Sequence, residues 1–150
     1  MFNGTTRITG LVFPPGTSTV LFLGSTGIGN YCYGEAAACG DPTNSSKGEH
    51  AYPYRAYAWA YSANDLAAVK AGTMQPWQVV PYATWELPGI GDVGQDFATG
   101  GAGYDPSTRQ LYVSVKLGDS TRPLIHVYSL NIGAATTTAP RAPANVRIVG

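Results

Sequence analysis

The stretch Gly100–Leu130 constrains the fold of this chain more than any other part of the sequence. Apolar and polar side chains alternate strictly from 111 to 117, and this period of two predicts a strand with one buried face. The residues expected on the buried face are Leu111, Val113, Val115 and Leu117. Asp105 and Pro106 precede the strand and predict a tight turn, because Asp accepts nearby backbone N–H bonds and the Pro ring fixes φ.

Two further segments complete this unit. Gly118–Ser120 is expected to end the strand, and Leu124–Leu130 predicts the next strand. His126 lies in the middle of that strand, where a lone histidine is typical of a structural residue. Before the turn, Gly100, Gly101 and Gly103 permit close backbone approach, as expected for a crowded inner strand.

The beginning of the chain repeats this arrangement. Ile8–Gly24 predicts a short strand, a Pro-Pro-Gly-Thr turn and then an apolar strand centred on Val20–Leu23. Repetition of one unit at two places is the signature of repeat architectures, in which neighbouring units stack.

At these residues the chain resembles a blade of a secreted bacterial β-propeller. The pattern G-x-x-Y-D-P-x-T-x-x-L-Y-V-S spans 101–114, and x-I-H-V-Y-x-L spans 124–130. The resemblance covers Gly100–Leu130 well and Ile8–Leu87 loosely. It implies an all-β chain of antiparallel sheets, with about two four-stranded blades over 1–130, the second of which lacks an obvious outer strand. It implies little about activity, because propellers host many functions.

The first unit carries additional segments. A long insertion over 25–52 is rich in Gly, Ala, Asn and Ser and shows little periodicity. Tyr54–Ser62 predicts a strand with aromatic residues on one face and alanines on the other. Asn64–Gly72 predicts one short helix with Asn64 or Asp65 as N-cap, and Pro81–Gly89 predicts an outer strand.

After residue 130 the sequence changes character. The segment 131–144 is rich in Ala, Thr and Pro and is expected to be a linker. Pro143–Val149 is similar to the opening strand of a fibronectin type III-like domain, which implies a multidomain parent protein. The alternative is that 131–150 is a linker and tail that packs on the preceding sheet.

Composition bounds the class of protein. The 150 residues include 44% hydrophobic and 12% charged residues, and 19 Gly and 11 Pro favour short strands joined by tight turns. Nine basic residues balance nine acidic ones, so no strong field favours binding to nucleic acid. No segment approaches the roughly 18 apolar residues needed to span a membrane.

The start of the chain has no recognisable signal peptide. Met1–Gly4 has neither a basic start nor an apolar run. The low charge, the many Thr and Tyr residues and the cysteine pair nevertheless favour an extracellular or periplasmic protein. The start is therefore expected to be an artificial boundary or the product of a truncated gene.

Cys32 and Cys39 lie in one loop of the insertion. A disulfide between them would brace that loop and contribute about 2–3 kcal/mol, and it would imply an oxidising compartment. Free thiols are the next alternative. A zinc site would need two more ligands, of which His50 is one candidate, and no Cys-x-x-Cys pattern supports it. No metal and no cofactor is therefore expected.

Asp41, Glu49 and His50 gather in the second half of the insertion. The functional interpretation is a calcium or substrate site, or an acid–base pair for catalysis. The alternative is a polar loop in which Asp41 caps a turn and His50 bonds to backbone.

Aromatic residues are concentrated in and after the insertion. A sugar-stacking platform is one interpretation, and packing between blades is the other. The residues expected on the platform are Tyr31, Tyr33, Tyr52, Tyr54 and Trp59, with Trp77 and Trp85 as further candidates. Gly89–Gly94 matches a dinucleotide-binding glycine motif only by accident, because it opens no helix.

Three functional hypotheses follow. The preferred one is a non-catalytic binding or scaffold module of a secreted protein, which uses the 25–52 insertion to bind a glycan or a protein. The second is a glycoside hydrolase- or lyase-like enzyme that uses Asp41 and Glu49. The third is a self-assembling structural protein. Because two blades cannot close a propeller, the chain is expected to form a homo-oligomer, a trimer or a tetramer.

Overall fold

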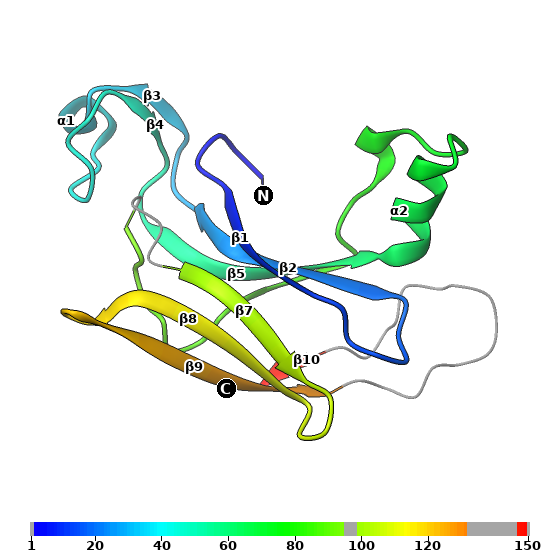
Figure 1. Cartoon of the computed structure of the whole chain (residues 1–150). Helices are drawn as coiled ribbons and strands as arrows, with labels where there is room; N and C mark the ends of the chain where they lie inside the picture. Colours follow the sequence, from blue (N-terminus) through cyan, green and yellow to red (C-terminus); the bar gives the residue numbers. More distant parts are fainter. Residues whose placement is uncertain (1, 95–98, 132–146, 150) are drawn as a thin grey trace.

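The structure is a computed structural model that describes residues 2–94, 99–131 and 147–149. It is all-β, with two four-stranded antiparallel sheets and a two-stranded ribbon (Figure 1). The first sheet contains, in spatial order, β1 (Arg7–Val12), β2 (Thr19–Gly27), β5 (Tyr54–Ser62) and β6 (Ala83–Glu86). The second contains β7 (Thr99–Asp105), β8 (Gln110–Asp119), β9 (Arg122–Asn131) and β10 (Arg147–Val149). Apart from the ribbon between β2 and β5, each sheet is therefore a meander in chain order.

The two sheets pack face to face around one apolar core. The first sheet contributes the small face of β5, where Ala56, Ala58 and Ala60 are all at most 1% exposed. The second sheet contributes larger side chains, including Leu111 and Val113. The burial of these three alanines confirms the predicted alternation of β5. Their small side chains allow the second sheet to lie close.

The first strands of the two sheets lie next to each other. Gly10 of β1 faces Ala102 of β7, and a Cβ atom at Gly10 would come within 2.8 Å of the Ala102 Cβ. The Thr9 and Thr99 hydroxyl oxygens are 3.4 Å apart at the same contact. A glycine at position 10 is thus required for the close approach of β1 and β7.

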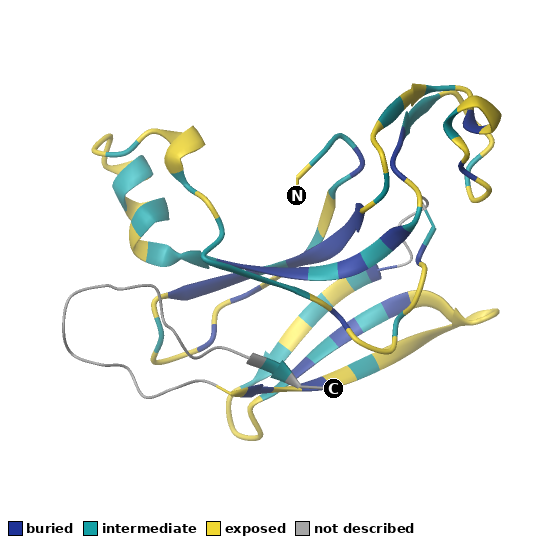
Figure 2. Cartoon of the chain, turned by 180° about the vertical axis from the view of Figure 1, so that it is seen from behind, coloured by how far each residue is buried: buried dark blue, intermediate teal, exposed yellow. Residues whose placement is uncertain are grey.

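The predicted phase of β8 is right for three of its four apolar residues. Leu111, Val113 and Val115 are at most 7% exposed, but Leu117 is 66% exposed. The pairing of β8 with β9 shifts register between Val115 and Asp119. The hairpin also continues beyond the core, and its tip is exposed (Figure 2). The strand break expected at 118–120 comes later, because β8 continues through Asp119 and the hairpin turn is at Ser120 and Thr121.

The second sheet has an outer strand after all. The short strand β10 pairs with β9 antiparallel, with Ile148 opposite Leu130. The segment after residue 130, expected as linker and tail, therefore returns to the sheet at 147–149, while residues 132–146 lie outside the described part of the chain. The resemblance of this tail to a fibronectin type III-like strand stays a prediction.

Two arms rise from the first sheet, on the side away from the second sheet (Figure 1). One arm consists of α2 (Ala63–Lys70) and the 3₁₀ turn η1 (Pro76–Gln78). The predicted helix begins earlier than expected, because Ser62 is the N-cap and accepts a hydrogen bond from the Asp65 N–H at 3.3 Å. No helix among the described residues is long and apolar enough to cross a membrane.

Candidate functional site

The second arm is the 25–52 insertion, and it is more ordered than its sequence indicates. Its first residues complete β2, and the rest forms β3 (Cys32–Gly34), α1 (Ala36–Cys39) and β4 (Gly48–His50). The predicted disulfide is confirmed: Cys32 in β3 is bonded to Cys39 at the end of α1, with Cα atoms 5.6 Å apart. The arm is therefore a short ribbon cross-linked to a single helical turn.

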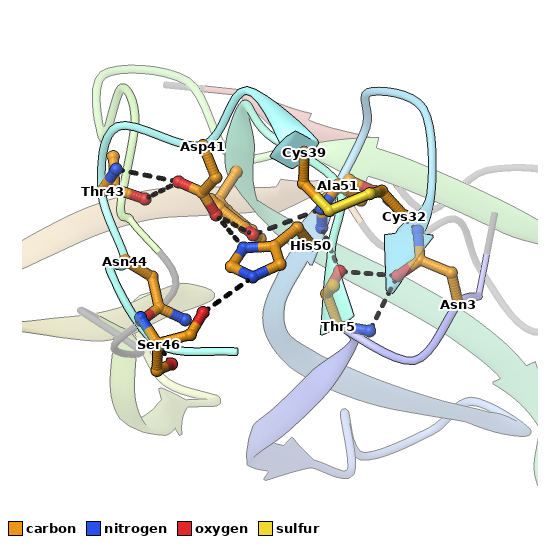
Figure 3. A network of polar contacts seen from close by, with 12 residues as sticks. Asn3, Thr5, Cys32, Cys39, Asp41, Thr43, Asn44, Ser46, His50 and Ala51 are labelled. Atoms are coloured by element: carbon orange, nitrogen blue, oxygen red, sulfur yellow. Dashed lines mark hydrogen bonds and ion pairs between the residues drawn. A yellow bond between two sulfur atoms is a disulfide. The ribbon is translucent and has the colours of Figure 1, made fainter. Parts of the chain in front are cut away.

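A buried polar network fixes the base of the arm (Figure 3). The His50 Nδ1 atom is 2.9 Å from Asp41 Oδ2, and the His50 Nε2 atom is 3.1 Å from the Ser46 carbonyl oxygen. Tyr54, the first residue of β5, donates its hydroxyl hydrogen to Asp41 Oδ2 at 2.6 Å. The side chains of Asp41 and His50 are both 0% exposed. The network thus ties the arm to the first sheet.

The contacts define the protonation state of this network. Both ring nitrogens of His50 face acceptor oxygens, so both carry hydrogens and the ring is an imidazolium. The bond to Asp41 raises the pKa of His50, which burial opposes. Burial raises the pKa of Asp41, but bonds from Tyr54, His50 and Thr43 outweigh it and hold that pKa well below its usual range. The pair is a buried ion pair.

Asp41 also caps the turn that follows it. Its Oδ1 atom accepts hydrogen bonds from the Thr43 backbone N–H at 2.8 Å and the Thr43 hydroxyl at 2.7 Å. This is an Asx-turn. Asp41 and His50 are therefore brought together, as the sequence suggested, but as a brace whose side chains are fully buried. The described residues contain no group of three or more His, Cys, Asp or Glu that could hold a metal ion.

Glu49 does not join Asp41 and His50. It lies on the opposite face of β4 from His50, because neighbouring strand residues point to opposite sides. Its partner across the ribbon is Tyr33, and its Oε1 atom accepts a hydrogen bond from the Tyr31 hydroxyl at 2.8 Å. The bond to Glu49 raises the pKa of Tyr31.

The outside of the arm therefore carries a patch that we call the arm patch, made of Tyr31, Tyr33 and Glu49. The two tyrosines are 51% and 70% exposed, respectively. Both present phenol rings to solvent beside one carboxylate. Of the five aromatic residues expected on a platform, only these two and Tyr52 are exposed.

The remaining platform residues lie elsewhere. Tyr52 is 37% exposed and lines a shallow depression of about 350 Å³ together with residues of α1 and its C-terminal turn. Tyr54 and Trp59 are 1% and 0% exposed, so neither ring lies at the surface in this structure. Tyr54 is instead the anchor of Asp41. Of the further candidates, Trp85 packs against the core and Trp77 is 78% exposed on η1.

Sequence reasoning missed the N-terminal turn, which lies against the arm. The Thr6 N–H donates to the Asn3 carbonyl oxygen at 3.0 Å, and the Asn3 side chain donates to the Gly27 carbonyl oxygen at 2.9 Å. A Cβ atom at Gly4 would collide with the Glu49 carboxylate, so the turn lies directly against the arm patch. The Asn3-Gly4 dipeptide is a recognised turn signal and is the feature that could have revealed it.

Comparison of the chain with protein-family models, with curated proteins and with solved structures finds no match. The functional argument therefore depends on the geometry of the arm and of the sheets.

Proposed function

We propose that the chain is a non-catalytic binding module of a secreted protein and that it binds glycans through the arm patch. The observation that carries this proposal is the exposure of Tyr31 and Tyr33 beside the carboxylate of Glu49. Phenol rings offer flat apolar surfaces for the C–H faces of pyranose rings, and the carboxylate accepts hydrogen bonds from sugar hydroxyls.

The construction of the arm supports this role. A binding surface loses less entropy on ligand binding when it is rigid beforehand. The Cys32–Cys39 disulfide and the buried Asp41–His50 pair both hold β3 and β4 in place. The disulfide also supports an extracellular or periplasmic location, because disulfides persist in oxidising compartments.

The enzyme alternative has less support. Hydrolysis of a glycoside requires two carboxyl groups that both reach the substrate. Asp41 is buried and bonded to His50, Tyr54 and Thr43, so it does not reach the surface on which Glu49 lies. We therefore assign no reaction to Asp41, Glu49 or His50.

The test of the proposed function is glycan binding by the whole chain and by a Tyr33→Ala variant, measured on a glycan array and then by calorimetry. We expect the unmodified chain to bind and the variant to lose affinity by about fivefold, as for one lost ring contact. Trp77→Ala is the matched control, because Trp77 is more exposed yet lies on the other arm. Equal loss in both variants, or no loss in Tyr33→Ala, contradicts the proposal.

A second candidate function, self-assembly, is favoured by the outer face of the second sheet. Ile125 and Val127 of β9 are 57% and 46% exposed there. On the same face, Gly101 and Gly103 of β7 leave open space where side chains would otherwise project. We propose that the two sheets are neighbouring propeller-like blades and that this flat apolar face packs on another copy. The chain order of strands in both sheets supports this interpretation.

A further inference from the structure

Three aromatic rings are stacked on the face of the first sheet that points away from the core. Trp59 lies between Phe2 and Tyr57, with ring centroids 5.2 Å and 5.8 Å away and interplanar angles of 29° and 26°. Trp59 belongs to β5, where its neighbours Ala58 and Ala60 point to the core. The stack therefore lies on the same side of the sheet as the two arms (Figure 1).

The indole N–H of Trp59 is buried and has no acceptor within the described part of the chain. Buried indole N–H groups usually find a hydrogen-bond partner, because leaving water without one is unfavourable. Trp59 is 0% exposed, so bulk water does not reach this N–H. The stack is thus well packed, but its indole N–H has no hydrogen-bond acceptor among the described residues.

Phe2 covers the stack and is itself 47% exposed. It precedes the N-terminal turn, which is anchored to the end of β2: the Gly27 N–H donates to the Thr5 hydroxyl at 2.9 Å, and Thr5 is 1% exposed. The Phe2 side chain brings a ring and no polar atom to Trp59. The Phe2 ring therefore covers the indole but leaves its N–H without a partner.

The stack and the arm patch are joined by this turn. Glu49 of the arm patch lies against Gly4, two residues from Phe2. A ligand that extends from the arm patch over the turn therefore reaches the place that Phe2 occupies.

We propose that Phe2 occupies a second saccharide subsite on Trp59. A pyranose unit displaces the Phe2 ring and stacks on the indole face, and an exocyclic hydroxyl at the indole edge accepts a hydrogen bond from the N–H, while neighbouring units bind the arm patch. The proposal rests on the proposed glycan-binding function and extends it to an oligosaccharide. Phe2 then reduces the apparent affinity, because the subsite is open for only part of the time.

The test uses cellohexaose and chitohexaose as probes and isothermal titration calorimetry on the whole chain. Phe2→Ala removes the competing ring and is expected to bind at least one probe about tenfold more tightly. Phe13→Ala is the matched control, since Phe13 is a 63% exposed phenylalanine that makes no ring stack with Trp59. In the Phe2→Ala background, Trp59→Phe keeps a ring, removes the N–H and is expected to weaken binding about fivefold.

A second measurement separates binding from folding. Trp59→Phe in the otherwise unmodified chain removes an unpaired buried donor, so the pH 7 melting temperature is expected to stay within a few degrees of the parent. The proposed subsite is overturned if Phe2→Ala binds the probes no better than Phe13→Ala. It is also overturned if adding Trp59→Phe to Phe2→Ala leaves the affinity for the probes unchanged. If Tyr33→Ala loses binding and Phe2→Ala has no effect, the arm patch is supported and only the subsite is rejected. If Phe2→Ala binds more tightly and Tyr33→Ala has no effect, the subsite is supported and the arm patch is rejected.

Discussion

At the scale of single residues, Asp41 and His50 form a buried ion pair at the base of the arm. Both side chains are fully buried, and Tyr54, Thr43 and Ser46 satisfy their remaining atoms. A buried charge that loses its partner is left uncompensated, which costs more than the pair itself contributes. The arm is therefore sensitive to the protonation of one histidine.

We expect this pair to give the protein a stability maximum in mildly acidic solution. The pKa of His50 is raised above 6.5, so its contribution is complete below pH 6.5 and is lost as the pH rises through the folded-state pKa. The pKa of Asp41 is lowered from 3.8, so its contribution is present above pH 3.8 and is lost on acidification. Urea unfolding measured from pH 4 to pH 9 tests this.

The control for the pH dependence is His50→Gln, which removes the titrating ring. It is expected to cost about 3 kcal/mol near pH 5.5 and to flatten the decline of the free energy of unfolding above pH 6.5. An equally steep alkaline decline in His50→Gln would show that other groups cause it.

A second residue-scale prediction concerns the phase of β8. Val113 is 1% exposed in the core, whereas its neighbour Ser114 points to the outer face of the second sheet. Val113→Asp is expected to destabilise the protein by several kcal/mol, because an unpaired carboxylate enters an apolar core. Ser114→Asp is expected to cost less than about 1 kcal/mol. Similar denaturation midpoints for the two variants would contradict the burial of Val113.

At the scale of elements, the arm depends on cross-links because its own core is very small. Among its described residues with apolar side chains, Ala36 and Ala51 are buried, and neither is large. The disulfide closes a loop with a sequence separation of 7, and restricting such a loop in the unfolded chain is worth about 2.5 kcal/mol.

We therefore expect a Cys32→Ser/Cys39→Ser double variant to loosen the arm more than the sheets. Amide hydrogen exchange is expected to become faster in β3 and β4, while β5 and β8 keep their protection. Intact mass after alkylation without reductant is the companion measurement, and it should show no modified thiol in the parent chain. Uniformly faster exchange in both sheets would mean that the arm and the sheets unfold as one unit.

The sequence predicts those elements whose burial follows a simple period. The alternation of Tyr54–Ser62 and of Leu111–Val115 is a local consequence of one buried face, so both strands are found where expected. Leu117 is exposed because it lies in the part of the β8–β9 hairpin that extends beyond the core. No local sequence pattern encodes where the opposing sheet ends. A strand was expected within Pro143–Val149, but its pairing with β9 was not, because β10 has only three residues and pairs across a long connection.

The candidate site is predicted less completely for the same reason. The sequence placed Asp41, His50 and two cysteines in one insertion, and the disulfide followed from their spacing. Trp59 stacks on Phe2, which is remote in sequence. Contacts of this kind depend on the tertiary arrangement of the chain.

At the scale of the whole molecule, the two sheets bury one face each against the other, and among the described residues the outer face of the second sheet exposes Ile125 and Val127. Figure 2 shows exposed residues along β9 and at the tip of the β8–β9 hairpin. Exposed apolar strips on flat sheets favour association. The formal net charge is zero at pH 7, so electrostatic repulsion does not oppose it.

We expect the chain to form a closed homo-oligomer. When one face of a copy packs on a different face of the next copy, repeating that contact generates a ring if the rotations add up to a full turn. If each copy supplies two blades, a trimer or a tetramer gives about six or eight blades, within the range of known propellers. Light scattering coupled to size exclusion across a dilution series measures this. Ile125→Lys introduces charge at the proposed contact and is expected to shift the mass toward the monomer, whereas Thr121→Lys in the exposed hairpin turn should not. A monodisperse, heat-stable monomer at micromolar concentration would show that one chain closes its own core and that the outer face needs no partner.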